Sequence, residues 1–163
     1  MNDTEIAKIF KNMADARPGG DRSPYMQVGS YDVHIVDIFL KESENPKRRD
    51  AKYLITKFRI VNSSNPTFVP GQECSWSADV TWPSFEADTK SLMLAILNEP
   101  LTPESNELAC QLILAAVGHE GAKEWLTKNW LSVGEMVKDK VVHLDCKMSR
   151  NGQFTKHYWS AKK

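Results

Sequence analysis

Apolar and polar residues alternate along five stretches of the chain, and this period of two predicts five β-strands. The stretches are 28–41, 53–62, 72–81, and the two arms of a hairpin within 141–159. Cys74, Trp76, Ala78 and Val80 occupy every second position of the third stretch, with polar residues between them. The later half of the first stretch is apolar on both faces, which favours a strand that curls into a closed barrel.

The last two stretches are joined by Asn151-Gly152. This dipeptide is typical of two-residue hairpin turns because both positions adopt positive φ. A two-residue turn fixes the register and places Lys147 opposite Lys156 and Asp145 opposite Tyr158. One face of the hairpin is then expected to join the core: Val142, Leu144, Cys146, Met148, Thr155, His157 and Trp159. The other face carries His143, Asp145, Lys147, Ser149, Phe154, Lys156 and Tyr158.

The second face places two lysines opposite each other, although like charges across a β-ladder repel. One interpretation is that an anion binds there, since cations interleaved with the rings of Phe154 and Tyr158 suit the phosphates and bases of single-stranded nucleic acid. The other is that the lysines diverge into water while the rings cover the edge of the core. The hairpin alone leaves both interpretations open.

Helical periodicity appears at the N-terminus and again between the third and fourth strands. Ile6, Ile9, Phe10 and Met13 form one apolar stripe of a short helix, capped by Asp3 or Thr4, that packs on the domain or on a second subunit. Residues 17–24 form a linker rich in glycine and proline. Further helices are predicted from a Ser84 cap to Leu97, from Thr102-Pro103 to Val117, which should be well buried, and over 121–131.

The order of elements is therefore three strands, a helical segment and two strands, which is the order of an oligonucleotide-binding (OB) barrel. We expect a mainly β, α+β fold: a five-stranded OB-like barrel with helices between strands 3 and 4 and a short N-terminal helix. Residues 1–24 would form the N-terminal helix and linker. Residues 25–163 would form the barrel, with a helical insertion at about 84–131.

Composition and charge narrow the function classes. The formal net charge of zero over 163 residues argues against a protein that coats duplex DNA, although the segment from residue 138 onward is basic. Cys74, Cys110 and Cys146 are far apart and lie among apolar neighbours, as expected of buried thiols in a reducing compartment. No apolar run can span a bilayer and no leader is present, so we expect a cytoplasmic protein without membrane contact.

No catalytic signature is found. The four histidines are scattered, and Asp37, Asp79 and Asp145 have no metal-ligand spacing. A phosphate-binding glycine loop, a nucleophile elbow and a zinc motif are all absent from the sequence. We therefore expect no enzyme, no cofactor and no metal.

The chain resembles phage-encoded OB-fold proteins related to viral single-stranded DNA-binding proteins, over roughly residues 25–160. The resemblance rests on these segments: Gly29-Ser30-Tyr31, 53–65 with Phe58, Val61 and Asn62-Ser63-Ser64, Pro70-Gly71-Gln72 with Ser75-Trp76, 141–144, and 152–157. It implies a phage replication or recombination accessory in the host bacterial cytoplasm that binds single-stranded DNA with little sequence specificity. Further partners would be a second copy, or a replication or host protein, bound through the N-terminal helix or the helical insert.

Ligands of OB barrels lie across strands 2 and 3 and between the first and last hairpin loops. Both loops are basic here, and aromatic residues accompany them. The expected nucleic-acid-binding residues are Lys47, Arg48, Arg49, Lys52, Tyr53, Lys57, Arg59, Trp76, Lys147, Arg150, Phe154, Lys156 and Tyr158. Trp76 shares a face with Cys74 and Val80, which favours a place in the core. The alternative function is a structural or host-interaction protein that uses the same barrel without nucleic acid.

Overall fold

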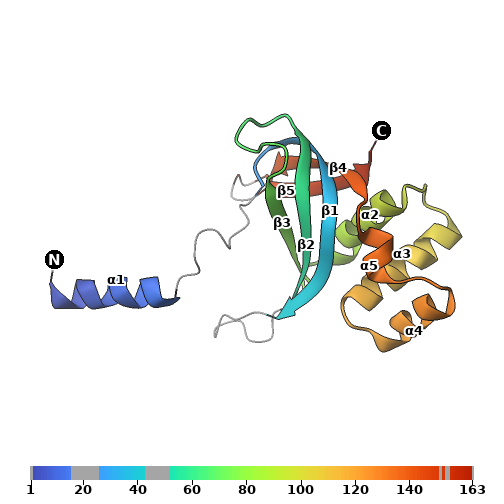
Figure 1. Ribbon diagram of the computed structural model, residues 1–163, viewed down its shortest axis with the longest axis horizontal. Coiled ribbons are helices and arrows are strands. Elements are labelled where there is room, and N and C mark those ends of the chain that lie inside the picture. Colours follow the sequence, from blue (N-terminus) through green and yellow to red (C-terminus); the bar gives the residue numbers. More distant parts are fainter. Residues whose placement is uncertain (1, 16–25, 43–51, 151, 153–154, 163) are drawn as a thin grey trace.

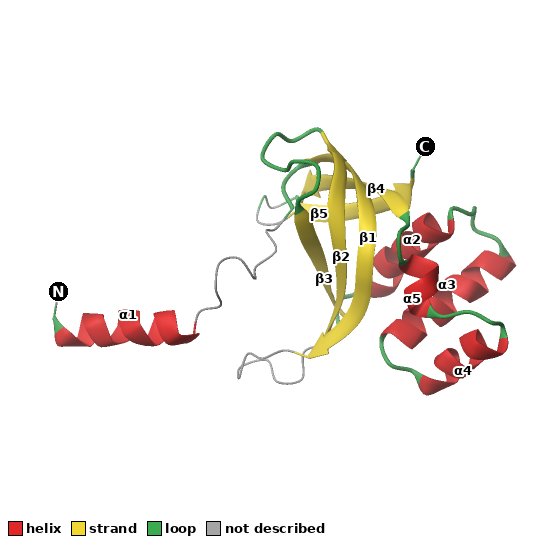
Figure 2. Ribbon diagram, in the orientation of Figure 1, coloured by secondary structure: helices red, strands yellow, loops and turns green. Residues whose placement is uncertain are grey.

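The protein combines one antiparallel β-sheet with a group of helices beside it (Figures 1 and 2). The computed structural model describes residues 2–15, 26–42, 52–150, 152 and 155–162, with only the backbone of 11–15. The elements are α1 Asp3–Asp15, β1 Gly29–Glu42, β2 Lys52–Ser63, β3 Glu73–Asp79, α2 Phe85–Leu97, α3 Pro103–Ala116, α4 Glu120–Lys128, α5 Val133–Val137, β4 Val141–Met148 and β5 Thr155–Ala161. Within these ranges no helix has the length and apolar character needed to cross a membrane.

The strand order is β3-β2-β1-β4-β5, and every neighbouring pair is antiparallel. The α+β class, the five strands, the helices between β3 and β4 and the N-terminal helix are thus confirmed. The sheet is open in the part of the chain that the structure describes, because no ladder joins β3 to β5 there. The closed barrel expected from the sequence is not observed.

The sheet nevertheless curls around its own core. Two register shifts bend β1 against β2, one between Asp32 and Val33 and one between Ile35 and Asp37. Such bulges increase the local bend and twist of a strand. Inside the curl, the ring of Trp76 on β3 lies 5.9 Å from the ring of His157 and 5.5 Å from that of Trp159 on β5. Side chains of the two edge strands therefore meet in the core, although their backbones do not pair.

The second bulge also changes which residues of β1 face inward. Tyr31, Val33 and Ile35 are buried, as the alternation predicts. The next buried residue is Ile38, which is three positions after Ile35 and so breaks the period of two. Phe39, which strict alternation from Tyr31, Val33 and Ile35 would place on the core side, instead lies beside Lys57, whose Nζ is 5.6 Å from the ring centroid. One extra residue in the strand explains the error, because it moves the following side chains to the opposite face.

The final hairpin has the predicted register. Lys147 is paired with Lys156, Asp145 with Tyr158 and Leu144 with Trp159. Asn151 lies outside the described residues, whereas Gly152 has a φ of +70°. Two assignments at the tip were wrong: Met148 is 54% exposed, and Ser149 is only 7% exposed. β4 ends at Met148, so the alternation of faces does not extend to the next residue.

The helices begin and end close to the predicted residues, with some differences in capping. Thr102 and Ser105 form a capping box that starts α3 at Pro103. Ser84 makes no side-chain capping bond to α2. The start of α1 is capped by Asn2 and not by Asp3 or Thr4, since the Glu5 amide donates to Asn2 Oδ1 at 2.8 Å.

The helical insert is longer than predicted. The predicted insertion ended at about residue 131, but the segment that follows contains the five-residue helix α5. α3 is less buried than expected, because Leu114 keeps 41% of its surface exposed. α2 packs against β5, α3 packs against α2, and α5 contacts β1, so the insert covers one end of the curled sheet.

Candidate nucleic-acid interface

The best-defined cluster of predicted binding residues lies on the outward face of the last hairpin. We call Lys147, Arg150, Lys156 and Tyr158 the hairpin group. All four side chains are exposed, and Tyr158 keeps 49% of its surface accessible. Lys147 Nζ lies 5.5 Å from the centroid of the Tyr158 ring. This separation is within the range of a cation–π contact. The ladder therefore presents cations and one aromatic ring on the same surface.

The hairpin lysines lack ion pairs within the described residues, although Lys147 acts electrostatically on Asp145 of the same strand. Lys147 and Lys156 are cross-strand partners, and neither forms an ion pair with any other described residue. Like charges directly opposite each other destabilise a ladder. An anion bound between them would remove that repulsion, so the lysine pair favours an anionic ligand.

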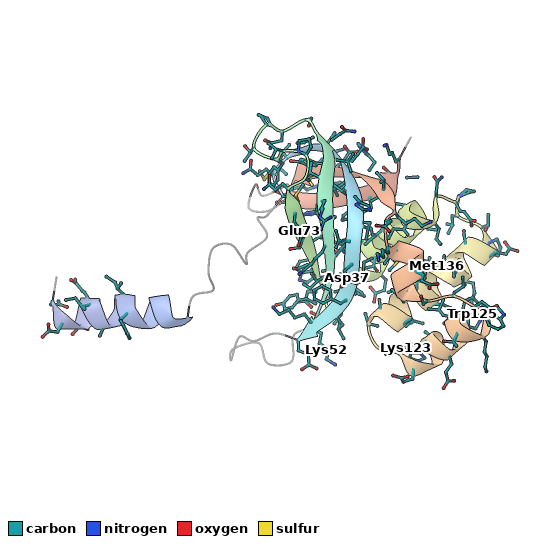
Figure 3. The ribbon with its side chains drawn as sticks, in the orientation of Figure 1. Asp37, Lys52, Glu73, Lys123, Trp125 and Met136 are labelled. Atoms are coloured by element: carbon teal, nitrogen blue, oxygen red, sulfur yellow. The ribbon has the colours of Figure 1, made fainter. Side chains whose placement is uncertain are left out.

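A second set of predicted residues lies on β2, and we call Lys52, Tyr53, Lys57 and Arg59 the β2 group. Their side chains alternate with buried Leu54, Thr56 and Phe58 and so face outward, apart from Lys52 at the strand end. Arg59 Nε lies 3.8 Å from Glu73 Oε2 on β3, and this exposed pair offsets its charge only in part. Figure 3 labels Lys52 and Glu73 toward opposite ends of these strands.

The hairpin group and the β2 group do not form one cluster. Tyr53 pairs with Lys41 near the C-terminal end of β1, whereas the hairpin group lies beyond the N-terminal end, where Gly29 pairs with Cys146. Both groups face outward from the same curled sheet. A ligand that touched both would have to follow the outer surface of the sheet over several strands.

A histidine held by two aspartates lies next to the hairpin group on the same face. His143 Nδ1 is 3.0 Å from Asp32 Oδ1, and His143 Nε2 is 3.1 Å from Asp145 Oδ1. Ser30 Oγ donates to Asp145 Oδ1 at 2.7 Å, and Asn62 Nδ2 donates to Asp32 Oδ2 at 3.1 Å. The network ties β1 to β2 and β4.

The network favours a charged histidine. Partial burial opposes the charge of His143, but hydrogen bonds to Asp32 and Asp145 outweigh it, so the pKa of His143 is raised. The bond from His143 lowers the pKa of Asp32, and the bond from Ser30, followed by that from His143, lowers the pKa of Asp145. An imidazolium can donate from both nitrogens at once, which matches the two carboxylate contacts.

Sequence reasoning missed this network. The alternation placed His143 and Asp145 on one face of β4, but Asp32 is more than one hundred residues away in the chain. Only the β1–β4 register, which pairs Asp32 with His143, brings them together. No local signal in the sequence specifies that register.

Trp76 does not belong to the interface. Its side chain is 7% exposed and lies inside the curl with His157 and Trp159, which agrees with the place in the core that its position on one face with Cys74 and Val80 favoured. Thr56 Oγ1, His157 Nε2 and Trp159 Nε1 are buried there, and the described residues offer them no hydrogen-bond partner. Burial lowers the pKa of His157 to about 4, so this ring is neutral at physiological pH.

Four of the predicted binding residues, Lys47, Arg48, Arg49 and Phe154, lie outside the described residues. The basic first loop is therefore not part of the geometry given above.

The described side chains bear on metal binding and on the chemistry of two thiols. No group of three histidine, cysteine or carboxylate residues in the described ranges could hold a metal ion. Burial raises the pKa of Cys74 to about 11 and that of Cys146 to about 12, which keeps both thiols protonated and unreactive.

Comparison of the sequence with protein-family models gives no matching family. Comparison with curated proteins likewise gives no match.

Proposed function

We propose that the protein binds single-stranded nucleic acid, with DNA as the expected ligand and little sequence preference. The observation that carries the proposal is the directly opposed pair Lys147 and Lys156, neither of which forms an ion pair with another described residue, beside the exposed Tyr158 ring. Phosphates would be held by the lysines and Arg150, while a base stacks on Tyr158. The resemblance to phage single-strand-binding proteins agrees with this chemistry and suggests a role in phage replication or recombination, in the bacterial cytoplasm.

The architecture supports the same proposal. The order β3-β2-β1-β4-β5 is the strand order of an OB barrel opened between β3 and β5, and the Trp76, His157 and Trp159 rings bridge that opening from inside. We propose that the domain is an OB-like barrel whose last side is closed by side chains. The β2 group, on the strand that usually contacts ligand, would extend the surface beyond the hairpin.

Fluorescence anisotropy with labelled oligonucleotides at several salt concentrations tests the proposal. The double variant Lys147→Ala/Lys156→Ala removes two phosphate contacts, so the slope of log K against log [salt] should fall by about 1.4. Tyr158→Ala should weaken binding by roughly 2 kcal/mol with little change in that slope. The matched control Lys90→Ala/Lys128→Ala removes the same charge from the helical insert and should leave binding unchanged.

Binding weaker than about 10⁻⁴ M at low salt would reject the proposal, because even non-specific nucleic-acid binding is usually tighter. Tighter binding to RNA than to DNA of the same sequence would show that RNA is the preferred ligand, and the proposed binding site would stand.

The second candidate function is that of a structural or interaction protein, and the helical insert favours it. Eight carboxylates and three lysines lie within residues 85–137, so the insert would repel nucleic acid. Trp130, just after α4, is 93% exposed. Exposed tryptophans often anchor protein–protein contacts. Loss of partner binding in Trp130→Ala, with DNA binding unchanged, would assign the insert to a protein partner.

A further inference from the structure

The N-terminal helix α1 carries an apolar stripe that the other described residues leave uncovered. Ile6, Ile9 and Phe10 share one face, and their exposed fractions are 51%, 45% and 73%. Figure 1 shows α1 standing apart from the sheet and the other helices. The helix has 13 residues. An isolated helix this short is marginal in water, so α1 needs a packing partner to be stable.

The junction between the sheet and the helical insert contains a groove of matching character. A pocket of about 380 Å³ lies between β1 and helices α3 to α5. Its lining is mainly apolar and includes Ile38, Leu40, Leu126, Leu131 and Val133. Lys123 and Asp37 also line it, and Figure 3 labels them on the helical and sheet sides of this junction.

The stripe and the groove fit the helix-in-groove mode of recognition, in which anchors at positions i, i+3 and i+4 enter one apolar cleft. Ile6, Ile9 and Phe10 have that spacing. The first turn of α1 is acidic, with Asp3 and Glu5, and so suits the side of the groove at Lys123 better than the side at Asp37. The charges thus favour one direction of the helix.

The number of residues between α1 and β1 favours docking of α1 in the groove of another molecule. Ten residues separate Asp15, the end of α1, from Met26. A random coil of that length spans roughly 17 Å on average. The groove is lined by Asp37 to Leu40, whereas the chain enters β1 at Gly29. Measured along the bent strand β1, Gly29 to Ile38 covers at most about 30 Å at about 3.3 Å per residue, which exceeds that span, so docking in the groove of a second molecule is the more favourable arrangement.

We propose that α1 of one copy docks in the groove between β1 and the helical insert of a second copy. If each copy offers one helix and one groove, reciprocal exchange closes a two-fold dimer. The contact lies away from the hairpin group, so it does not depend on nucleic-acid binding.

Sedimentation velocity of the full chain tests the exchange. The wild type should be a dimer at micromolar concentrations. Two substitutions should each weaken dimerisation at least about thirty-fold. Phe10→Asp places a charge in the stripe, and Thr127→Trp fills the groove from an exposed position. Lys8→Asp, on the opposite face of α1, is the matched control and should remain dimeric.

Mixing the two variants distinguishes exchange from docking within one chain. The intact helix of Thr127→Trp can enter the intact groove of Phe10→Asp, so the mixture regains one of the two contacts and should form more dimer than either variant alone. Any of three results would overturn the proposal. The wild type could be monomeric at high micromolar concentration, the dimer could survive both substitutions, or the mixture could stay monomeric. Should Thr127→Trp fail to fold, hydrogen exchange decides instead: amides of α1 must exchange more slowly in wild type than in Phe10→Asp, and equal rates would reject the exchange.

Discussion

His143 Nδ1 lies 3.0 Å from Asp32 Oδ1, which joins the fourth strand to the first by a charged hydrogen bond next to the proposed nucleic-acid site. The other ring nitrogen, His143 Nε2, lies 3.1 Å from Oδ1 of a second aspartate, Asp145. The protonation of one imidazole therefore affects the pairing of two strands that are distant in sequence.

The first prediction concerns the pH range over which this network stabilises the fold. Because the folded pKa of His143 is raised, its contribution is full below the unfolded value of about 6.5 and is lost as pH rises through the folded value. The carboxylates behave in the opposite sense, since their contribution is lost as pH falls through their lowered pKa values. His143→Asn should therefore cost roughly 1 kcal/mol at about pH 5.5 and less at about pH 9, measured by urea unfolding.

A cost that is equal at both pH values would show that His143 stabilises the fold by packing and not by charge.

The second prediction contrasts two histidines of the same hairpin. His157 faces the core, and burial lowers its pKa to about 4, whereas the pKa of His143 is raised above 6.5. In an NMR titration the ring protons of His143 should shift above pH 6.5, while those of His157 stay at their neutral positions until about pH 4. The neutral His157 adds acid sensitivity, because its stabilising contribution is full above pH 6.5 and is lost as pH falls toward 4. Titration of both rings near pH 6.5 would contradict the burial of His157.

The third prediction concerns the entry to β1. A Cβ on Gly29 would lie 2.9 Å from Tyr31 Oη and 3.2 Å from Asn65 Cβ. Tyr31 is 1% exposed and its hydroxyl donates to the Gln27 carbonyl, so its ring has little room to move. Gly29→Ala should destabilise the protein by roughly 2 kcal/mol in thermal unfolding.

Gly134→Ala is the matched control, because nothing lies within 4 Å of the added Cβ and the residue is in helix α5. It should be neutral or stabilising by up to about 1 kcal/mol. Equal effects of the two substitutions would mean that the Tyr31 contact does not restrict position 29.

The fourth prediction concerns the end of α4. The Leu131 amide donates to the Leu126 carbonyl at 2.8 Å and the Trp130 amide to the Thr127 carbonyl at 3.1 Å. These are the two bonds of a Schellman motif. Trp130 occupies the left-handed position of this motif, with a φ of +59°, where glycine is the usual residue. Trp130→Gly should stabilise the fold by roughly 1 kcal/mol, because a Cβ is unfavourable in this conformation.

Trp130→Ala separates the two effects of that substitution, since it removes the ring and keeps the Cβ. Its melting temperature should stay near that of the wild type. Destabilisation by both substitutions would show that the exposed ring contributes to folding.

The final hairpin could be predicted in detail because its determinants are local. The Asn151-Gly152 dipeptide predicts a short turn with a defined register, so Lys147 opposite Lys156 followed from the sequence. The faces of β2 and β3 were equally clear from strict alternation. Helix α3 was marked by its Thr102 cap and Pro103.

The features that could not be predicted depend on contacts between distant segments. The bulge between Ile35 and Asp37 leaves no mark in the apolar run that contains it. The Asp32–His143 contact depends on how β1 pairs with β4. Helix α5 has only five residues, too few for a clear helical period. The part of the candidate site that follows from local pattern was thus predicted, and its electrostatic surroundings were not.

The pairing of β1 with β4 also has a consequence for how quickly the protein folds. Ser30 and Asp145, which bond across it, are 115 residues apart, and helices α2 to α5 lie between them in the chain. Closing so long a loop is slow compared with forming helices or a hairpin. Pulse-labelled hydrogen exchange should therefore detect protected amides in the insert and in the β4–β5 hairpin before the N-terminal half of β1. During that interval β4 exposes an unpaired edge, so newly synthesised chains are most prone to aggregate just before β1 and β4 join.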